Sequence, residues 1–191
     1  YSTVLVRSAG KPINGFGGTA SGPEILIDGI KKISGVIKER EGKKLRSIDV
    51  LDIANIIGSV VVAGNVRRSA EIALGDPDDY LYIKAKRWDL GNIPNWRAMS
   101  NNTIYCDSYD HIAEGVWDGY AGNGEPYGFF NVMLSSKFGR TGEKAKENCE
   151  GTNPCGEISL AEKECCNLAE LYLNNITSKE ELIECSTLIY K

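Results

Sequence analysis

The chain has 191 residues, of which 42% are apolar and 25% charged, and its formal net charge at pH 7 is −4. This composition excludes an intrinsically disordered chain, and the negative charge argues against nucleic-acid binding through phosphates. The longest apolar run, Ile56 to Ala63, is interrupted by Gly58 and Ser59 and is far too short to cross a membrane.

The two ends of the sequence suggest a piece of a larger protein. The chain begins at Tyr1 rather than Met, without a signal-peptide pattern, and it stops at Lys191 inside an apparent helix. We therefore expect residues 1–191 to be a single segment, incomplete at both ends, of a longer cytoplasmic protein with no membrane or nucleic-acid partner.

The first half of the chain predicts a loop and two helices. Residues 7–22 are rich in glycine and predict the loop, after which Pro23 opens a helix that ends near residues 41–43. Its apolar residues recur at helical spacing: Ile27, Ile30, Ile33 and Ile37. Ser47 is a suitable N-cap for a second helix reaching Val62, which is apolar on most faces and is therefore expected to be largely buried.

The second half predicts alternating strands and helices. A strand is expected at the end of residues 66–74, and others at 100–106 and 127–132, with a helix over 110–120. Ser178 and Glu181 have the spacing of a capping box, which predicts a last helix. This alternation, without a repeat or a linker, favours an α/β fold.

Cysteine and histidine spacing argues against a metal site. The six cysteines are Cys106, Cys149, Cys155, Cys165, Cys166 and Cys185. No Cys-x-x-Cys pair occurs, so we predict no structural zinc. His111 is the single histidine and falls in the predicted helix 110–120, where we expect a solvated side chain. Two glycosylation sequons, at Asn101 and Asn175, are interpreted as chance matches.

The most informative stretch is residues 151–160, Gly-Thr-Asn-Pro-Cys-Gly-Glu-Ile-Ser-Leu. Pro154 biases the preceding residue toward extended backbone, and alternate side chains of an extended segment share one side. We therefore expect the amide of Asn153, the thiol of Cys155 and the carboxyl of Glu157 to project together. With no histidine nearby to make a thiolate, this trio suits hydrogen-atom chemistry with a carboxylate base. A buried cysteine in a tight turn is the alternative.

These residues also carry a family resemblance. Residues 153–157 resemble the active-site finger loop of ribonucleotide reductases, and Cys166-Asn167-Leu168 is similar to the family's Cys-Asn-Leu element. Longer stretches most resemble the monomeric, adenosylcobalamin-dependent ribonucleoside-triphosphate reductases: residues 15–23, 61–75 and 150–161.

The resemblance implies a catalytic role for each matching residue. Cys155 would become a thiyl radical that removes the hydrogen from C3′ of the ribose, and Glu157 would take the proton of the 3′-hydroxyl. Asn153 would hydrogen-bond the substrate. Cys166 would be one of two cysteines that reduce the substrate radical and end as a disulfide. The cysteine is doubled here, and the following Asn-Leu assigns this role to Cys166 rather than Cys165.

A second set of candidate residues belongs to allosteric control. Residues 63–71 resemble the family's second specificity loop, which links a bound deoxynucleotide effector to substrate choice. The candidates there are Gly64, Asn65, Arg67 and Arg68. Arginine suits phosphate or base edges, although a solvated arginine pair at a helix end is the alternative. Residues 7–13 resemble the first specificity loop more weakly.

The resemblance implies part of a ten-stranded α/β barrel with the finger loop at its centre. It also implies reduction of ribonucleoside triphosphates with adenosylcobalamin as cofactor and a thioredoxin-like reductant. The segment alone would be inactive, because its second redox cysteine and phosphate-binding loop would lie elsewhere. The alternatives are a large subunit that uses diphosphates and a separate metal-containing radical subunit, a non-catalytic nucleotide-binding module, and a cysteine-rich redox or metal-binding domain.

Overall fold

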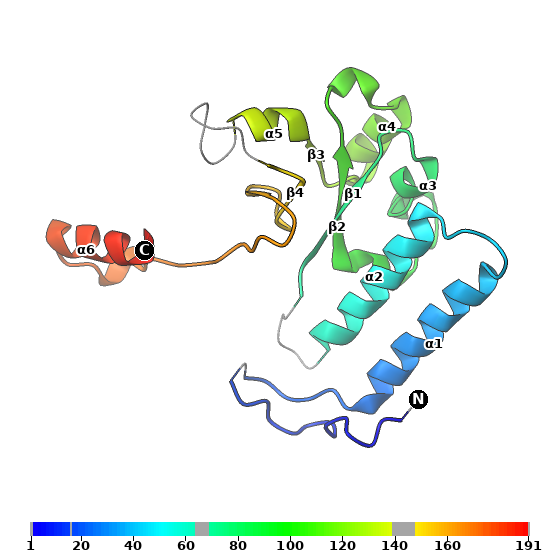
Figure 1. Ribbon diagram of the computed structural model, residues 1–191, viewed down its shortest axis with the longest axis horizontal. Helices are drawn as coiled ribbons and strands as arrows, with labels where there is room; N and C mark the ends of the chain where they lie inside the picture. Colours follow the sequence, from blue (N-terminus) through cyan, green and yellow to red (C-terminus); the bar gives the residue numbers. More distant parts are fainter. Residues whose placement is uncertain (1, 16, 64–68, 139–147, 191) are drawn as a thin grey trace.

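The computed structural model describes residues 2–15, 17–63, 69–138 and 148–190 (Figure 1). The α-helices of these residues are α1 (Pro23–Glu39), α2 (Ser47–Val62), α3 (Tyr80–Ile83), α4 (Glu114–Asn123), α5 (Val132–Phe138) and α6 (Lys179–Tyr190). The strands are β1 (Glu71–Gly75), β2 (Ser100–Tyr105), β3 (Gly128–Phe130), β4 (Gly151–Thr152) and β5 (Ser159–Leu160). Short 3-10 turns are η1 (Trp88–Leu90), η2 (Asn95–Met99), η3 (Tyr109–His111) and η5 (Leu173–Asn175).

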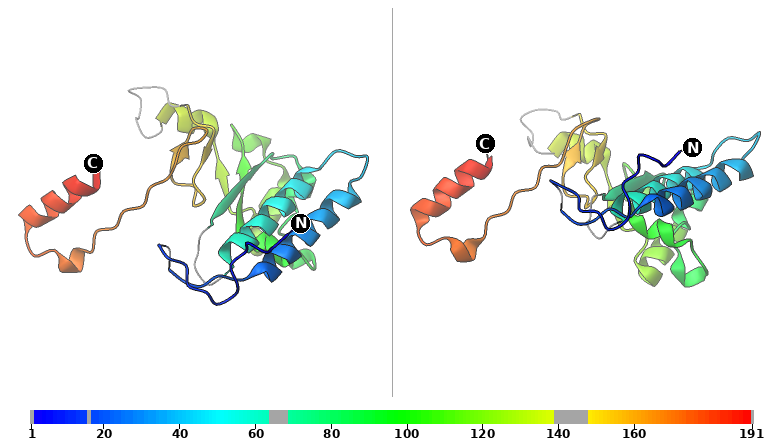
Figure 2. Two further views of the ribbon diagram at one scale, coloured as in Figure 1. Left: turned by 60° about the horizontal axis from the view of Figure 1, so that its bottom comes forward. Right: turned by 90° about the horizontal axis from the view of Figure 1, so that it is seen from below.

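Strands β1, β2 and β3 form a parallel sheet in that order, with β2 in the middle. Parallel neighbours need a crossover connection, and the chain supplies α3 between β1 and β2 and α4 between β2 and β3. Figures 1 and 2 show α2 running across this sheet with α1 alongside it. The alternation of helices with parallel strands confirms the predicted α/β class.

The side chains of β2 alternate between two environments. Ser100, Asn102 and Ile104 are at most 2% exposed, and Ile104 belongs to the core shared with the helices. Asn101 is half-buried and Tyr105 is exposed on the opposite face. The other buried members of the core cluster are Ile48, Leu51, Tyr82, Ile83, Ala85, Cys106, Ile112 and Val116.

Tyr82 of α3 joins the helix layer to the sheet. Its hydroxyl is shared between the carbonyl oxygens of Ala73, at 2.6 Å, and Thr103, at 3.0 Å. Burial raises the pKa of this hydroxyl, so it remains a proton donor. Gly75 leaves room for the ring, because a Cβ atom at that position would lie 2.2 Å from two ring carbons.

Both N-terminal helices lie where the sequence predicts them, but α2 is less buried than expected. Gly29 of α1 packs closely on α2, since a Cβ there would lie 2.5 Å from a methyl carbon of Val60. The remaining face of α2 exposes Val50, Ile57 and Val61, whose side chains are 54%, 49% and 41% exposed. The prediction of a largely buried helix is therefore wrong for this face, because α1 and the sheet cover only part of the helix surface.

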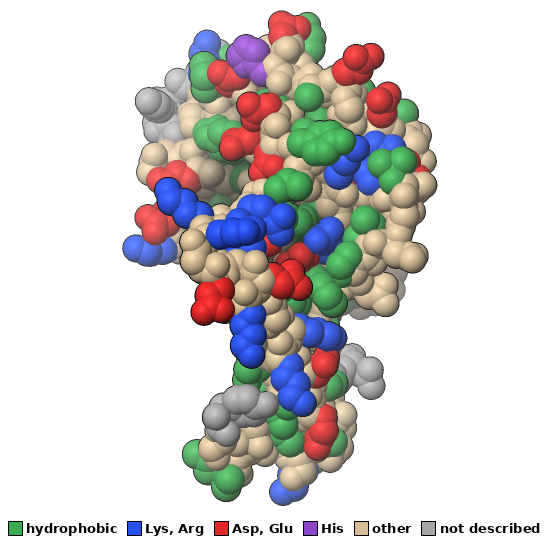
Figure 3. All heavy atoms as spheres, turned by 90° about the vertical axis from the view of Figure 1, so that its right-hand side faces the viewer, with side chains coloured by type: hydrophobic (Ala, Val, Ile, Leu, Met, Phe, Trp, Pro, Cys, Tyr) green, Lys and Arg blue, Asp and Glu red, His purple; other side chains and the backbone are tan. Residues whose placement is uncertain are grey.

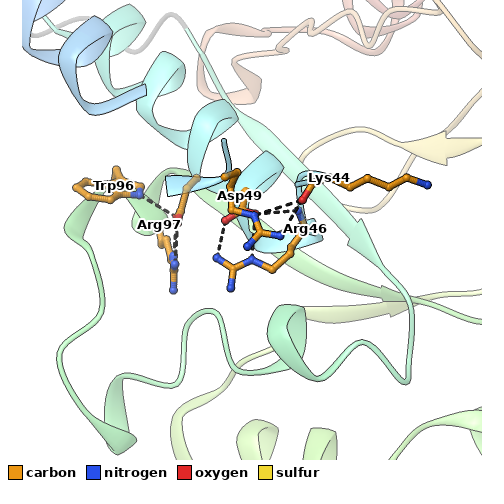
Figure 4. Close-up of polar contacts among 7 residues, drawn as sticks. Lys44, Arg46, Asp49, Trp96 and Arg97 are labelled. Atoms are coloured by element: carbon orange, nitrogen blue, oxygen red, sulfur yellow. Dashed lines mark hydrogen bonds and ion pairs between the residues drawn. The ribbon is translucent and has the colours of Figure 1, made fainter. Parts of the chain in front are cut away.

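The start of α2 is capped by its own third residue (Figure 4). Asp49 accepts a hydrogen bond from the backbone N–H of Arg46 at 2.8 Å and another from its guanidinium at 2.7 Å. The guanidinium bond lowers the pKa of Asp49 to about 2. The expected cap at Ser47 is wrong: Ser47 is the first helical residue, and Arg46 occupies the cap position.

A second aspartate ties α2 to the short η2 turn, whose Trp96 and Arg97 are labelled in Figure 4. Asp52 accepts two hydrogen bonds from the guanidinium of Arg97, at 2.6 and 2.7 Å, and one from the indole of Trp96 at 2.9 Å. Figure 3 shows Lys and Arg side chains gathered around the connection between α1 and α2. That connection contributes Arg40, Lys43, Lys44 and Arg46.

The segment after β2 differs from its prediction. Residues 109–111 form the η3 turn, and α4 begins only at Glu114, so the helix predicted over 110–120 is displaced along the chain. The hydroxyl of Ser108 accepts from the N–H of Asp110 at 3.3 Å, which favours the tight turn. His111 is exposed, as expected, and its Nδ1 lies 2.8 Å from a carboxylate oxygen of Asp107. The strand predicted over 127–132 is shorter, because α5 begins at its end.

The last part of the chain leaves the sheet. Figure 2 shows α6 standing apart, joined to the rest by an extended stretch. The helix and its cap are confirmed, since the N–H of Glu181 donates to the hydroxyl of Ser178 at 3.1 Å. The Glu181 carboxylate accepts from the N–H of Thr177 at 2.8 Å. None of the helices described here has the length and apolar character needed to cross a bilayer.

Candidate active site

A tight turn joins β4 to β5, which pair as an antiparallel hairpin. The N–H of Asn153 donates to the carbonyl of Ile158 at 3.1 Å, and the N–H of Gly156 donates to the carbonyl of Asn153 at 2.9 Å. The second bond closes a four-residue turn whose last residue, Gly156, has a positive φ of +87°, a conformation that favours glycine. The prediction of an extended segment is therefore wrong, because the chain reverses direction within these residues.

Asn153 is the hub of the turn and is 4% exposed. Its amide nitrogen donates to a carboxylate oxygen of Glu157 at 2.7 Å and lies 3.7 Å from the sulfur of Cys166. Its amide oxygen accepts from the N–H of Ile158 at 3.0 Å. The structure therefore brings together three of the four predicted catalytic residues, Asn153, Glu157 and Cys166, although by a turn rather than by an extended strand.

Cys155 occupies the exposed tip of the same turn. Its thiol forms no hydrogen bond with any residue that the structure describes. The alternative interpretation, a cysteine buried in a tight turn, is correct for the turn and wrong for the burial. The arrangement leaves the sulfur accessible from outside the segment while its neighbours are held in place by Asn153.

The two neighbouring cysteines lie in different environments. Cys166 is half-buried and contacts Asn153, whereas Cys165 is exposed. The remaining cysteines lie away from this site. Cys106 is buried in the core and its burial raises the pKa of its thiol. Cys149 is buried with its sulfur 3.3 Å from the carbonyl of Gly151, and Cys185 is half-buried in α6.

A cavity of about 520 Å³ lies beside the turn. Asn153, Pro154 and Cys166 contribute to its lining, whereas Cys155 and Glu157 do not. The rest of the lining comes from α2, the starts of β1 and β2, and the hairpin: Leu51, Ala54, Ala70, Glu71, Ile72, Ala73, Ser100, Thr152, Leu160 and Glu164. The hub of the turn and the candidate redox cysteine thus share one cavity.

Sequence reasoning missed two polar residues near this cavity. Glu71 lines it from β1, beside Gly58 of α2, where a Cβ would lie 2.0 Å from a Glu71 carboxylate oxygen. Burial raises the pKa of this carboxyl. Asn101 of β2 donates from its side chain to the carbonyl of Pro154 at 2.6 Å. Glu71 ends the stretch that resembles the second specificity loop but was not singled out there, and the only signal at Asn101 is the glycosylation sequon.

The candidate effector residues cannot be placed with the others. Gly64, Asn65, Arg67 and Arg68 lie outside the described residues. The weaker candidate loop, residues 7–13, is described and mostly exposed, and a guanidinium nitrogen of Arg7 lies 3.4 Å from the carbonyl of Pro12. Among the residues described, no group of three or more His, Cys, Asp and Glu side chains could hold a metal ion.

Neither a protein-family model nor a solved structure matches the chain. Curated relatives do match it. The adenosylcobalamin-dependent ribonucleoside-triphosphate reductase of Lactobacillus helveticus is 47% identical over 171 residues, which is 87% of this chain. The reductase of the same description from Lactobacillus leichmannii is 45% identical over 175 residues, again 87% of the chain. Over this segment, the chain is similar to adenosylcobalamin-dependent ribonucleoside-triphosphate reductases.

The similarity to these ribonucleotide reductases confirms the resemblance predicted from the motifs. A third relative, from Lactobacillus acidophilus, has the same description and is 47% identical over 171 residues. The chain spans 23% of the length of each of these three reductases. It therefore corresponds to about a quarter of such a protein.

Proposed function

We propose that the protein containing this segment reduces ribonucleoside triphosphates to 2′-deoxyribonucleoside triphosphates by a thiyl-radical mechanism, for DNA precursor synthesis. The observation that carries the proposal is the contact of one amide, that of Asn153, with both Glu157 and Cys166 in the turn that bears Cys155. The names of the reductase relatives support the same chemistry. The segment would form part of a ten-stranded α/β barrel with this turn at its centre.

Cys155 would be the residue that attacks the sugar. Its exposed thiol has no hydrogen-bond partner among the described residues, which suits a sulfur that works as a neutral thiol and radical. In the first step on the substrate, the thiyl radical takes the hydrogen atom from C3′. The S–H bond forms, the C3′–H bond breaks, and the unpaired electron moves to the sugar.

Glu157 would then handle the proton of the 3′-hydroxyl. An ionised carboxylate only accepts hydrogen bonds, so it can take this proton while the 2′-hydroxyl departs as water with a proton from the reducing cysteine pair. The carboxyl would return its own proton to the 3′-oxygen when the sugar is reduced. The Asn153 amide holds one Glu157 oxygen at 2.7 Å, which leaves the second oxygen for the substrate. Asn153 would thus orient the base as well as hydrogen-bond the substrate.

Cys166 would supply reducing equivalents together with a second cysteine from elsewhere in the protein. Two thiols become one disulfide, and the two electrons and two protons that they lose balance the replacement of the 2′-hydroxyl by hydrogen with release of water. The position of Cys166 on the cavity lining, 3.7 Å from the Asn153 amide, supports this role. A thioredoxin-like dithiol would return the disulfide to thiols.

Adenosylcobalamin is proposed as the cofactor because the relatives are named for their dependence on it. When bound, it would supply the one-electron oxidising equivalent that the thiol needs. Of the described residues, the exposed Cys155 fits a partner of this kind, but the cavity lining does not include its thiol. The residues that hold the cofactor would therefore come from other parts of the protein.

Allosteric control would involve the loop at residues 63–71. Gly64, Asn65, Arg67 and Arg68 are proposed to contact a deoxynucleotide effector, because arginine side chains suit phosphate groups and base edges. The loop directly precedes β1, whose first residues line the cavity beside Asn153. A change in this loop could therefore reach the substrate site through β1. The proposed reaction and its nucleotide partners support a cytoplasmic location.

The test is substitution of Cys155 in the full-length protein, with Cys165→Ser as the matched control. Deoxynucleotide formation from a ribonucleoside triphosphate is measured with adenosylcobalamin and a dithiol reductant. We expect Cys155→Ser to abolish product formation. Cys165→Ser changes an exposed thiol and should retain product formation. Product formation by Cys155→Ser would refute the proposal.

The same assay separates the cobalamin enzyme from the alternative with a separate radical-generating subunit. Omitting adenosylcobalamin should stop the reaction, and a ribonucleoside diphosphate should be a poor substrate. Activity without cobalamin, dependent on an added metal-containing subunit, would instead favour the large-subunit alternative. Nucleotide binding without any turnover would favour a regulatory module.

A further inference from the structure

The reactive turn is fastened to the central strand of the sheet at one point. The side-chain nitrogen of Asn101 donates to the carbonyl oxygen of Pro154 at 2.6 Å, across 53 residues of sequence. Between described residues, this is the one recorded side-chain hydrogen bond that joins the turn at 153–158 to strands β1, β2 and β3. The hydrogen bonds of Asn153 close the turn on itself but do not fix it relative to the sheet.

Asn101 is well placed to act as an anchor because its strand is held from both sides. Strand β2 pairs with β1 over Ser100–Ile104, where Asn101 lies opposite Ile72, and with β3 from Thr103 onward. At the residue before Asn101, Lys86 donates to the carbonyl of Ser100 at 2.8 Å and forms an ion pair with Glu125 at 2.6 Å. The Ser100 hydroxyl in turn donates to Asn102 at 2.8 Å.

The bond acts on the peptide group that leads into Cys155. The carbonyl of Pro154 and the N–H of Cys155 belong to the same planar peptide unit. Fixing that carbonyl therefore limits rotation of the backbone immediately before the Cys155 α-carbon, and with it the direction of the Cα–Cβ bond. The exposed thiol forms no hydrogen bond with a described residue that could set this direction.

We propose that Asn101 is a positioning residue that sets the direction of the Cys155 side chain at the tip of the turn. The inference rests on the proposed function, since it assigns to Asn101 the alignment of the proposed radical sulfur. Ser100, the preceding residue, lines the cavity, so strand β2 carries both Asn101 and part of the cavity lining. Loss of alignment by about 1 Å can cost about 100-fold in rate.

The test compares Asn101→Ala and Asn101→Asp with Tyr105→Phe in the full-length reductase. Asn101→Asp keeps the size of the side chain but places a carboxylate oxygen where the donor was, opposite a carbonyl oxygen. Tyr105 lies on the same strand and the same face, is 40% exposed, and is a matched control. Steady-state reduction gives kcat and KM, and hydrogen exchange of residues 153–158 reports on the turn without any turnover.

Both Asn101 variants should lower kcat about 10- to 100-fold with little change in KM, because substrate binding is retained while alignment is lost. Exchange of the turn amides should rise about 5- to 10-fold, the effect of one lost hydrogen bond. Tyr105→Phe should change neither. If Asn101→Ala fails to fold, the isosteric Asn101→Asp carries the test.

Two results would overturn the inference. Unchanged exchange of residues 153–158 in both variants would mean that Asn101 does not hold the turn. Faster exchange with an unchanged kcat would mean that it holds the turn without aligning Cys155. Failure of the proposed function would look different from failure of this inference. The wild-type protein would then make no deoxynucleotide, while hydrogen exchange would still report on the Asn101–Pro154 hydrogen bond.

Discussion

Replacing Asn153 by alanine should loosen the turn that carries Cys155. The substitution removes the acceptor of the Ile158 N–H, at 3.0 Å, and the donor to Glu157, at 2.7 Å. Asn153 is 4% exposed, so water cannot readily replace these bonds. A neutral hydrogen bond contributes about 1 kcal/mol, and the bond to the exposed carboxylate of Glu157 contributes about 1–2 kcal/mol after screening. The turn should therefore lose about 2–3 kcal/mol.

Amide hydrogen exchange measures this loss directly. A loss of about 2–3 kcal/mol raises the equilibrium constant for opening of the turn about 30- to 150-fold. The exchange rate of the Ile158 amide should rise by the same factor relative to wild type. The matched control is Glu157→Gln, which removes the charge but keeps a side-chain oxygen that can accept from Asn153. The control should accelerate exchange less than about 10-fold. Acceleration of less than about 3-fold in Asn153→Ala would show that the side chain does not hold the turn.

Two further predictions concern the scaffold. Because the fold lowers the pKa of Asp49 from 3.8 to about 2, its ion pair with Arg46 stabilises the fold above about pH 4, and this contribution is lost as the pH falls toward 2. Urea unfolding between pH 6 and 2.5 should show about 1 kcal/mol more acid loss for wild type than for Asp49→Asn, whereas parallel curves would contradict the assignment. Gly75→Ala should lower stability by about 1–3 kcal/mol, because its Cβ would meet the Tyr82 ring. In thermal melts Gly115→Ala, with nothing within 4 Å of its Cβ, should be neutral or stabilising, and equal melting temperatures for the two variants would refute the clash.

The sequence predicts best those parts of the fold whose cause is local. The isoleucine stripe of α1 and the apolar run of α2 place both helices, since periodicity and start signals act within a few residues. The cap predicted at Ser47 is wrong because the helix begins one residue earlier than a Ser47 cap would allow, and Asp49, three residues after Arg46, accepts the Arg46 N–H. The pairing of Asp52 with Arg97 could not be foreseen, because the two residues are 45 apart and meet only through packing.

The candidate site shows the same division. Its residue types were predictable, since Asn153, Glu157 and Cys166 stand in a recognisable pattern and are in contact. The backbone conformation of the site was not predictable. The side chain of Asn153 accepts the N–H of Ile158 and so stabilises a reversal of the chain, which the preference of a residue before proline for extended backbone does not predict. Asn101 gave no usable signal, since its partner is a backbone carbonyl far away in the sequence.

The order of the parallel sheet leaves β1 and β3 as outer strands, each paired on one side among the described residues. Along their outer flanks, amide and carbonyl groups are free to recruit neighbouring strands, from the same polypeptide or from another molecule. The 191-residue piece in isolation would therefore be prone to self-association along these flanks. In a longer polypeptide, pairing of β1 and β3 with further strands would remove this tendency.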